Sequence, residues 1–131
     1  MEQPRFRFVC APSALASEHA EWARVLTEEG ELALMCSEGL QEVERVAHEL
    51  DQLAVVVVRS ERTRELQEQT VMGYAAAMPL VWVSDDFSES ARAWARERGP
   101  MTLLSECDGP LDDGERRRIE RFLAIIARQS E

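Results

Sequence analysis

Four consecutive valines, Val55 to Val58, are the feature of this sequence that most constrains its fold. They belong to an apolar run that begins at Leu53 and is closed by Arg59. A short, β-branched run without polar positions predicts a strand that is covered on both faces, as central strands of parallel sheets are. Open α/β sheets bind ligands at the carboxyl ends of their strands, so the residues that follow this run matter for function.

The rest of the chain alternates short apolar runs with helical patterns, and we expect strands over 5–10, 31–36, 53–58, 80–84 and 101–105. A helix is expected after each strand, with the N-caps Ser13, Ser37, Ser88 and either Asp112 or Asp113. This alternation predicts right-handed crossovers and a parallel sheet with helices on both faces. The expected fold is α/β: a flavodoxin-like (βα)5 three-layer sandwich with five parallel strands in the order 2-1-3-4-5. That order would place the valine run in the middle of the sheet.

Composition restricts the possible functions. A chain of 131 residues has the length of one domain, which we expect to cover 1–131. Its net charge of −10 disfavours direct binding to nucleic acid or to anionic membrane surfaces. All 15 basic residues are arginine, which excludes mechanisms that need a lysine. With no apolar run long enough for a membrane span, no export signal and three widely spaced cysteines, we expect a cytoplasmic protein with free thiols.

Two local patterns, together with the five strand-helix units, resemble the receiver domain of bacterial two-component response regulators. Residues 79–84 resemble the family's fourth strand, which ends in a conformational-switch Thr or Ser, here Ser84. Residues 99–106 resemble the segment through the family's fifth strand. The resemblance covers nearly the whole chain and implies a signalling function.

The residues that this family uses for phosphotransfer are replaced. The resemblance places its two magnesium-binding acids at Cys10 and Ala11, which cannot supply anionic oxygen ligands. Its phosphoacceptor aspartate corresponds to Val58 or Arg59, and neither can form an acyl phosphate. Its phosphate-contacting lysine corresponds to Glu106. We therefore expect a degenerate receiver, or pseudo-receiver, which acts without phosphorylation, catalysis, a metal or a cofactor.

A basic cluster on the last expected helix is a candidate interface. Receiver domains commonly pair through the face formed by the fourth helix, fifth strand and fifth helix, so the resemblance implies a protein partner or a homodimer at this face. An exposed tryptophan beside arginines is typical of an interface hot spot, although Trp94 could equally lie in the core. The candidate interface residues are Trp94, Arg98, Arg116, Arg117, Arg118 and Arg121.

A second hypothesis is a small α/β enzyme or ligand-binding protein that uses the strand ends. Its working groups would be the Cys10 thiol or a group of acids near Arg59, which would neutralise them. Turn formation and helix capping explain Asp85 and Asp86 without any function. The acids are Asp85, Asp86, Glu106 and Asp108.

Overall fold

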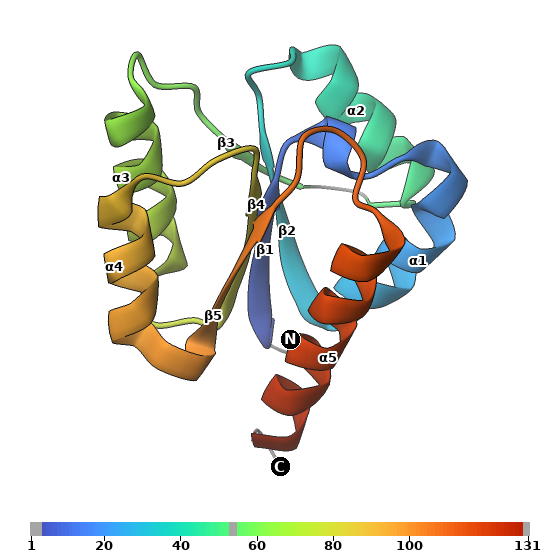
Figure 1. The fold of residues 1–131 in the computed structure, drawn as a ribbon. Helices are drawn as coiled ribbons and strands as arrows, with labels where there is room; N and C mark the ends of the chain where they lie inside the picture. The colour runs from blue at the N-terminus through green and yellow to red at the C-terminus, as the bar shows by residue number, and fades with distance from the viewer. Residues whose placement is uncertain (1–3, 53–54, 130–131) are drawn as a thin grey trace.

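The protein, described here by a computed structural model over residues 4–52 and 55–129, is an α/β sandwich (Figure 1). Its five strands are β1 (Phe6–Cys10), β2 (Gly30–Met35), β3 (Val56–Val58), β4 (Leu80–Ser84) and β5 (Thr102–Glu106). Its α-helices are α1 (Ala20–Leu26), α2 (Leu40–Glu49), α3 (Arg64–Ala75), α4 (Glu89–Arg98) and α5 (Asp113–Gln129). Short 3₁₀ turns occupy Pro12–Ala14, Ser17–His19, Thr27–Glu29 and Gly99–Met101. All strand pairings are parallel, so the predicted α/β class with five strand-helix units is confirmed.

The strand order is β3-β2-β1-β4-β5, and the predicted order 2-1-3-4-5 is wrong. β1 is central, with β2 and β4 as neighbours, whereas β3 lies at one edge of the sheet. Val57 is 44% exposed and only Val58 of this strand is buried. Leu53 and Ala54, which were expected to open the strand, lie outside the described residues. An apolar run indicates that a strand contacts apolar neighbours, but it does not indicate which strands flank it.

Helices cover both faces of the sheet (Figure 1). α1, α2 and α5 lie on one face, while α3 and α4 lie on the other. The first core lies between the sheet and the helices α1, α2 and α5, and the second core lies between the sheet and the helices α3 and α4. In β1, Phe6, Phe8 and Cys10 are buried in the first core and Val9 is buried in the second. Alternate residues of a strand point to opposite faces, so a strand with apolar residues on both faces needs this double cover.

Two of the four predicted helix caps are confirmed. The Ser88 hydroxyl accepts the Ala91 backbone N–H at 3.1 Å, and the Asp112 carboxylate accepts the Glu115 N–H at 2.8 Å. Each cap satisfies a backbone donor that the first turn of a helix leaves without an intrahelical partner.

Ser13 and Ser37 do not cap helices, which corrects two predictions. α1 begins only at Ala20, after two 3₁₀ turns, and α2 begins after Gly39, whose φ of 102° suits a residue without a Cβ. Ser13 instead lies in the 3₁₀ turn Pro12–Ala14 that follows β1, and Ser37 lies in the loop that follows β2. Both segments lie at the carboxyl edge of the sheet.

Gly30 opens β2 directly against the Phe6 ring. A Cβ at this position would lie 2.3 Å from two Phe6 ring atoms. Because Phe6 is 5% exposed and has little room to move, we expect Gly30→Ala to lower the free energy of unfolding by about 1–3 kcal/mol in urea denaturation. Gly73→Ala in α3, where a Cβ meets no atom within 4 Å, is the control and should not destabilise the protein. An equal cost of Gly30→Ala in a Phe6→Leu background would contradict this explanation.

Candidate functional site

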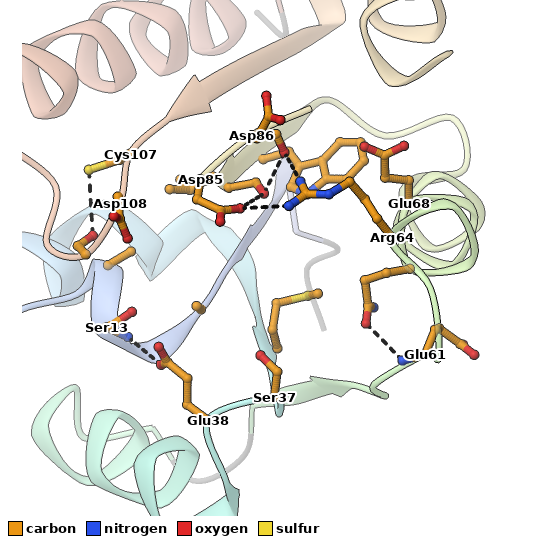
Figure 2. A pocket seen from close by; sticks show the side chains of 18 of the residues that line it. Ser13, Ser37, Glu38, Glu61, Arg64, Glu68, Asp85, Asp86, Cys107 and Asp108 are labelled. Carbon is orange, nitrogen blue, oxygen red and sulfur yellow. Dashed lines mark hydrogen bonds and ion pairs between the residues drawn. The ribbon is translucent and has the colours of Figure 1, made fainter. Parts of the chain in front are cut away.

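A cleft of about 430 Å³ lies across the carboxyl edge of the sheet, and we call it the rim cleft (Figure 2). The strand order reverses between β1 and β4: the chain leaves β1 toward α1 on one face and leaves β4 toward α4 on the other. Open α/β sheets bind their ligands at such a switch point. The rim cleft is lined by residues at or beyond the carboxyl ends of all five strands, namely parts of 11–14, 35–38, 61–68, 82–86 and 107–109.

Hydrogen-bonding groups line the walls of the rim cleft (Figure 2). On one wall, the Ser13 backbone N–H donates to the Glu38 carboxylate at 3.0 Å, which joins the loop after β1 to the loop after β2. The Ser13 and Ser37 hydroxyls and the Asp108 carboxylate have no hydrogen-bond partner within the described residues. These groups are therefore available to a ligand.

The rim cleft is acidic. Six of its lining residues are acidic and two are arginine, a formal excess of four negative charges, which Arg59 and Arg92 reduce from outside the lining by pairing with Glu61 and Asp86. One of the arginines, Arg64, is already engaged, because it donates to the Asp86 carbonyl at 2.8 Å and lies 3.7 Å from the Asp85 carboxylate. Such a lining attracts cations and repels phosphate groups. The acidic residues are Glu38, Glu61, Glu68, Asp85, Asp86 and Asp108.

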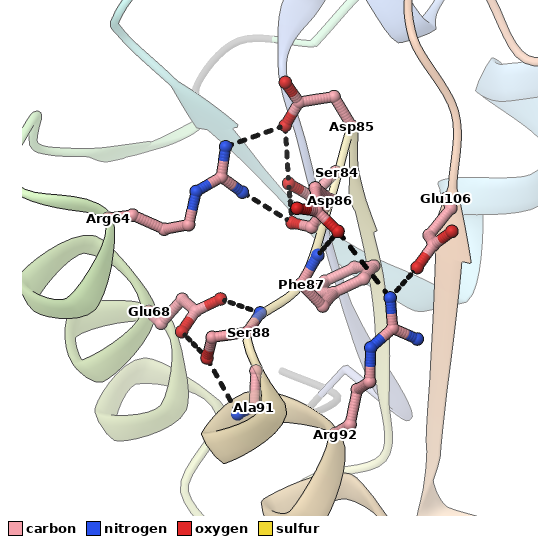
Figure 3. A network of polar contacts seen from close by, with 10 residues as sticks. All are labelled: Arg64, Glu68, Ser84, Asp85, Asp86, Phe87, Ser88, Ala91, Arg92 and Glu106. Carbon is pink, nitrogen blue, oxygen red and sulfur yellow. Dashed lines mark hydrogen bonds and ion pairs between the residues drawn. The ribbon is translucent and has the colours of Figure 1, made fainter.

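Two arginines fix the loop between β4 and α4 (Figure 3). Arg64 holds this loop from α3, while Arg92, in the first turns of α4, lies 3.7 Å from Asp86 and also pairs with Glu106. The Ser84 hydroxyl donates to the Asp86 carbonyl at 3.0 Å, which tightens the turn. These contacts set the shape of the upper wall of the rim cleft before any ligand arrives.

Glu68 holds the same loop from below (Figure 3). Glu68 is 5% exposed. Its carboxylate accepts hydrogen bonds from the Ser88 N–H, at 2.9 Å, and from the Ser88 hydroxyl. Ser88 in turn caps α4 at Ala91. A buried carboxylate needs such donors, because burying it without them is costly. Glu68 thus joins α3, the rim cleft and the start of α4.

Arg59 does not pair with any of the four acids that it was predicted to neutralise, Asp85, Asp86, Glu106 and Asp108; it pairs with Glu61 instead. Its side chain is 80% exposed and donates to Glu61 at 2.6 Å. β2 and β1 lie between β3 and β4, and neighbouring strands are about 4.8 Å apart, so the end of β3 is distant from Asp85 and Asp86. The cations that face these acids are those of Arg64 and Arg92.

The positions selected by the receiver resemblance do not come together as one site. Only Ala11 and Ser84 line the rim cleft. Val58 is buried against the layer of α3 and α4, and Glu106 is engaged by Arg92. The expected arrangement would require β3 between β1 and β4, whereas β1 pairs directly with β4 and β3 lies beyond β2.

The three cysteines are free and differ in environment. Cys10 is fully buried, and this burial raises the pKa of its thiol far above the usual range. Because the reactive species is the thiolate, Cys10 does not qualify as a nucleophile. The Cys36 sulfur lies 3.5 Å from the Ser60 hydroxyl, and the Cys107 thiol donates to the Pro110 carbonyl at 3.1 Å. Over residues 4–52 and 55–129, no group of three or more His, Cys, Asp or Glu side chains could hold a metal ion.

The predicted interface residues separate into engaged and free groups. Trp94 is half-buried: it packs edge-on against Trp82 with ring centroids 6.1 Å apart, and Arg98 covers its ring at 4.7 Å. Arg116 donates to the Leu111 carbonyl at 2.7 Å, and its side chain is 14% exposed.

The other three predicted interface residues, Arg117, Arg118 and Arg121, are exposed residues of α5. Arg118 donates to the Leu104 carbonyl at 3.1 Å and is exposed. Arg117 and Arg121 are exposed and have no partner in the described part of the chain. The side chains still available to another molecule are therefore mainly those of these two residues.

Sequence reasoning missed the side chains that organise the rim cleft, Arg64, Glu68 and Arg92. A start signal for α3 was available, because Thr63 accepts the Leu66 N–H at 3.1 Å as an N-cap. Nothing in the sequence separates buried Glu68 from exposed Glu65, since both lie among polar residues of one helix.

No protein-family model, curated protein or solved structure matches this chain. Within the described residues, none of the helices combines the length and the apolar character that crossing a membrane requires. The fold and the rim cleft define a three-layer α/β protein with a polar cleft at its topological switch point.

Proposed function

We propose that this protein is a regulatory binding module that acts without phosphotransfer and recognises a small organic cation in the rim cleft. The observation that carries the proposal is the excess of carboxylates in a cleft at the topological switch point. Its volume of about 430 Å³ is that of an ordinary small-molecule site. The ligand class follows from the charge of the lining.

The groups that line the cleft support this ligand chemistry. Glu38 and Asp108 are exposed carboxylates, and Ser13 and Ser37 carry hydroxyls without partners in the described residues. Ammonium and guanidinium groups donate charge-assisted hydrogen bonds to carboxylates, which are about twice as strong as neutral ones. A phosphorylated ligand would meet repulsion from the same side chains.

The residues at the carboxyl ends of the strands support the part of the proposal that the protein is regulatory and not catalytic. Cys10 is buried, and the positions that phosphotransfer would need, Ala11 and Val58 or Arg59, carry no acid. We place the module in the cytoplasm, because free cysteines suit a reducing compartment. This proposal includes the pseudo-receiver interpretation, which implies a signalling role for the protein.

Docking of a protein partner through the face of α4, β5 and α5 is the second candidate function. Arg117 and Arg121 favour it, because both are exposed and have no partner among the described residues. The two functions use different surfaces, so one module could perform both.

Agmatine, which carries an amine and a guanidinium but no carboxylate, is the probe for the rim cleft. We expect it to bind in titration calorimetry and the double variant Glu38→Gln, Asp108→Asn to bind about tenfold more weakly. The matched control is Glu44→Gln, Glu65→Gln, which removes two exposed carboxylates outside the cleft lining and should leave affinity unchanged. Ribose 5-phosphate binding as tightly as agmatine, or equal losses in both double variants, would contradict the proposal.

A further inference from the structure

The outward face of α5 carries a row of arginines. Successive helical residues are about 100° apart, so Arg117, Arg121 and Arg128 lie within about 40° of one another around the helix. All three are exposed, and exposed Ala124 and Ile125 lie between them. Ile125 is 48% exposed. We call these five residues the arginine face of α5.

The charge of this face is not neutralised locally. Elsewhere on the protein, Arg24 and Arg45 pair with glutamates of their own helices. Arg117, Arg121 and Arg128 form no hydrogen bond or ion pair within residues 4–52 and 55–129. Three uncompensated arginines, with an exposed isoleucine beside them, are therefore concentrated on a protein whose net charge is −10.

We propose that the arginine face of α5 docks an acidic segment of another protein. Guanidinium groups bind carboxylates through paired hydrogen bonds, and Ile125 supplies an apolar contact beside the arginines. Arg117 and Arg128 are separated by eleven helical steps of about 1.5 Å, or about 16 Å. An extended segment of about five residues spans this length.

A second copy of this chain does not fit the same face. In a two-fold dimer, the same patch of both subunits meets itself. Arg117, Arg121 and Arg128 would then oppose the same arginines of the partner, and such juxtaposition of like charges is unfavourable. The charge of the face thus favours a heterologous acidic partner over the homodimer expected from the receiver resemblance.

Nucleic acid is also a poor occupant. Its phosphates continue beyond any single helix face, and exposed Asp112 and Asp113 lie at the start of α5, with Glu106 at the end of the adjacent strand. A long polyanion would therefore meet acidic groups next to the arginines. A short acidic segment avoids them.

The neighbouring edge of the sheet limits how the segment binds. β5 is the last strand of the sheet, and a groove of about 350 Å³ beside it is lined in part by Arg92, Arg96 and Arg118. Arg118 donates to the Leu104 carbonyl, so it covers part of the strand edge. Partial covering of an edge disfavours an added strand, so we expect the segment to bind along α5 through its side chains.

Fluorescence anisotropy with labelled hexaglutamate tests the proposal. We expect saturable binding that weakens with added salt and that falls about tenfold in the variant Arg117→Gln, Arg121→Gln, Arg128→Gln. Arg62→Gln is the control, because Arg62 is an exposed arginine without a partner among the described residues but lines the rim cleft. It should bind the peptide as the unmodified protein does. Circular dichroism checks that the triple variant is folded.

Several results would overturn the proposal. They are unchanged peptide affinity in the triple variant, equal binding of hexaserine, tighter binding of a short oligonucleotide or phosphatidylserine vesicles, and a dimer in light scattering that the triple variant abolishes. Agmatine affinity should be the same in the triple variant and the unmodified protein. This measurement separates failure at the arginine face from failure of the rim-cleft proposal.

Discussion

Replacing Trp82 by alanine is expected to lower the free energy of unfolding by about 3–5 kcal/mol. Trp82 is 3% exposed and lies on β4, between β1 and β5. Its ring packs edge-on against Phe87 at 5.0 Å and against Trp94 at 6.1 Å. Replacing Trp82 by alanine therefore removes the large side chain from the core between the sheet and the helices α3 and α4, and leaves a cavity there. Urea denaturation followed by circular dichroism measures the loss.

Trp82→Phe is the matched variant, because it keeps an aromatic ring against Phe87 and should cost much less than the alanine variant. Trp82 also lines the rim cleft, so Trp82→Ala should weaken agmatine binding as well as stability. A loss of stability below about 1 kcal/mol for Trp82→Ala would contradict the packing described for this core.

The second large effect is expected at Glu68. Glu68→Ala leaves the Ser88 N–H without its buried acceptor and removes the bond to the Ser88 hydroxyl, so we expect a loss of about 2–3 kcal/mol. Glu68→Gln keeps one acceptor oxygen and should cost less. Glu65→Ala, on the exposed side of the same helix, is the control and should change stability by less than about 0.5 kcal/mol.

Hydrogen exchange distinguishes a local role of Glu68 from a general loss of stability. We expect the Ser88 amide to exchange faster in Glu68→Ala than the global destabilisation alone explains, because its acceptor is gone. If all amides accelerate equally, Glu68 does not hold the loop between β4 and α4 as the structure indicates.

Some details of the fold could be predicted because their causes are local. Ser88 and Asp112 were identified as caps because a side-chain oxygen just before a helix satisfies the free N–H groups of its first turn. Ser13 and Ser37 carry the same signal but lie in segments that line the rim cleft. The path of the chain after β1 and β2 decides their role, and no short window of sequence contains that path.

The candidate site was predicted only in part for a related reason. Asp85, Asp86 and Asp108 were expected at the carboxyl edge of the sheet, and all three line the rim cleft. Their position follows from the alternation of strands and helices, since parallel strands end at one edge. The contacts of Arg64 and Glu68 with the β4–α4 loop depend instead on α3 packing beside that loop.

The sequence by itself determined five strand-helix units, a parallel sheet and two covered faces, because apolar periodicity is a property of the local chain. Only the tertiary structure decided the strand order, since an apolar strand packs in the middle or at an edge with the same residues. That order moved Val56–Val58 to the edge and Arg59 away from Asp85 and Asp86. It also placed the switch point, and with it the rim cleft, between β1 and β4.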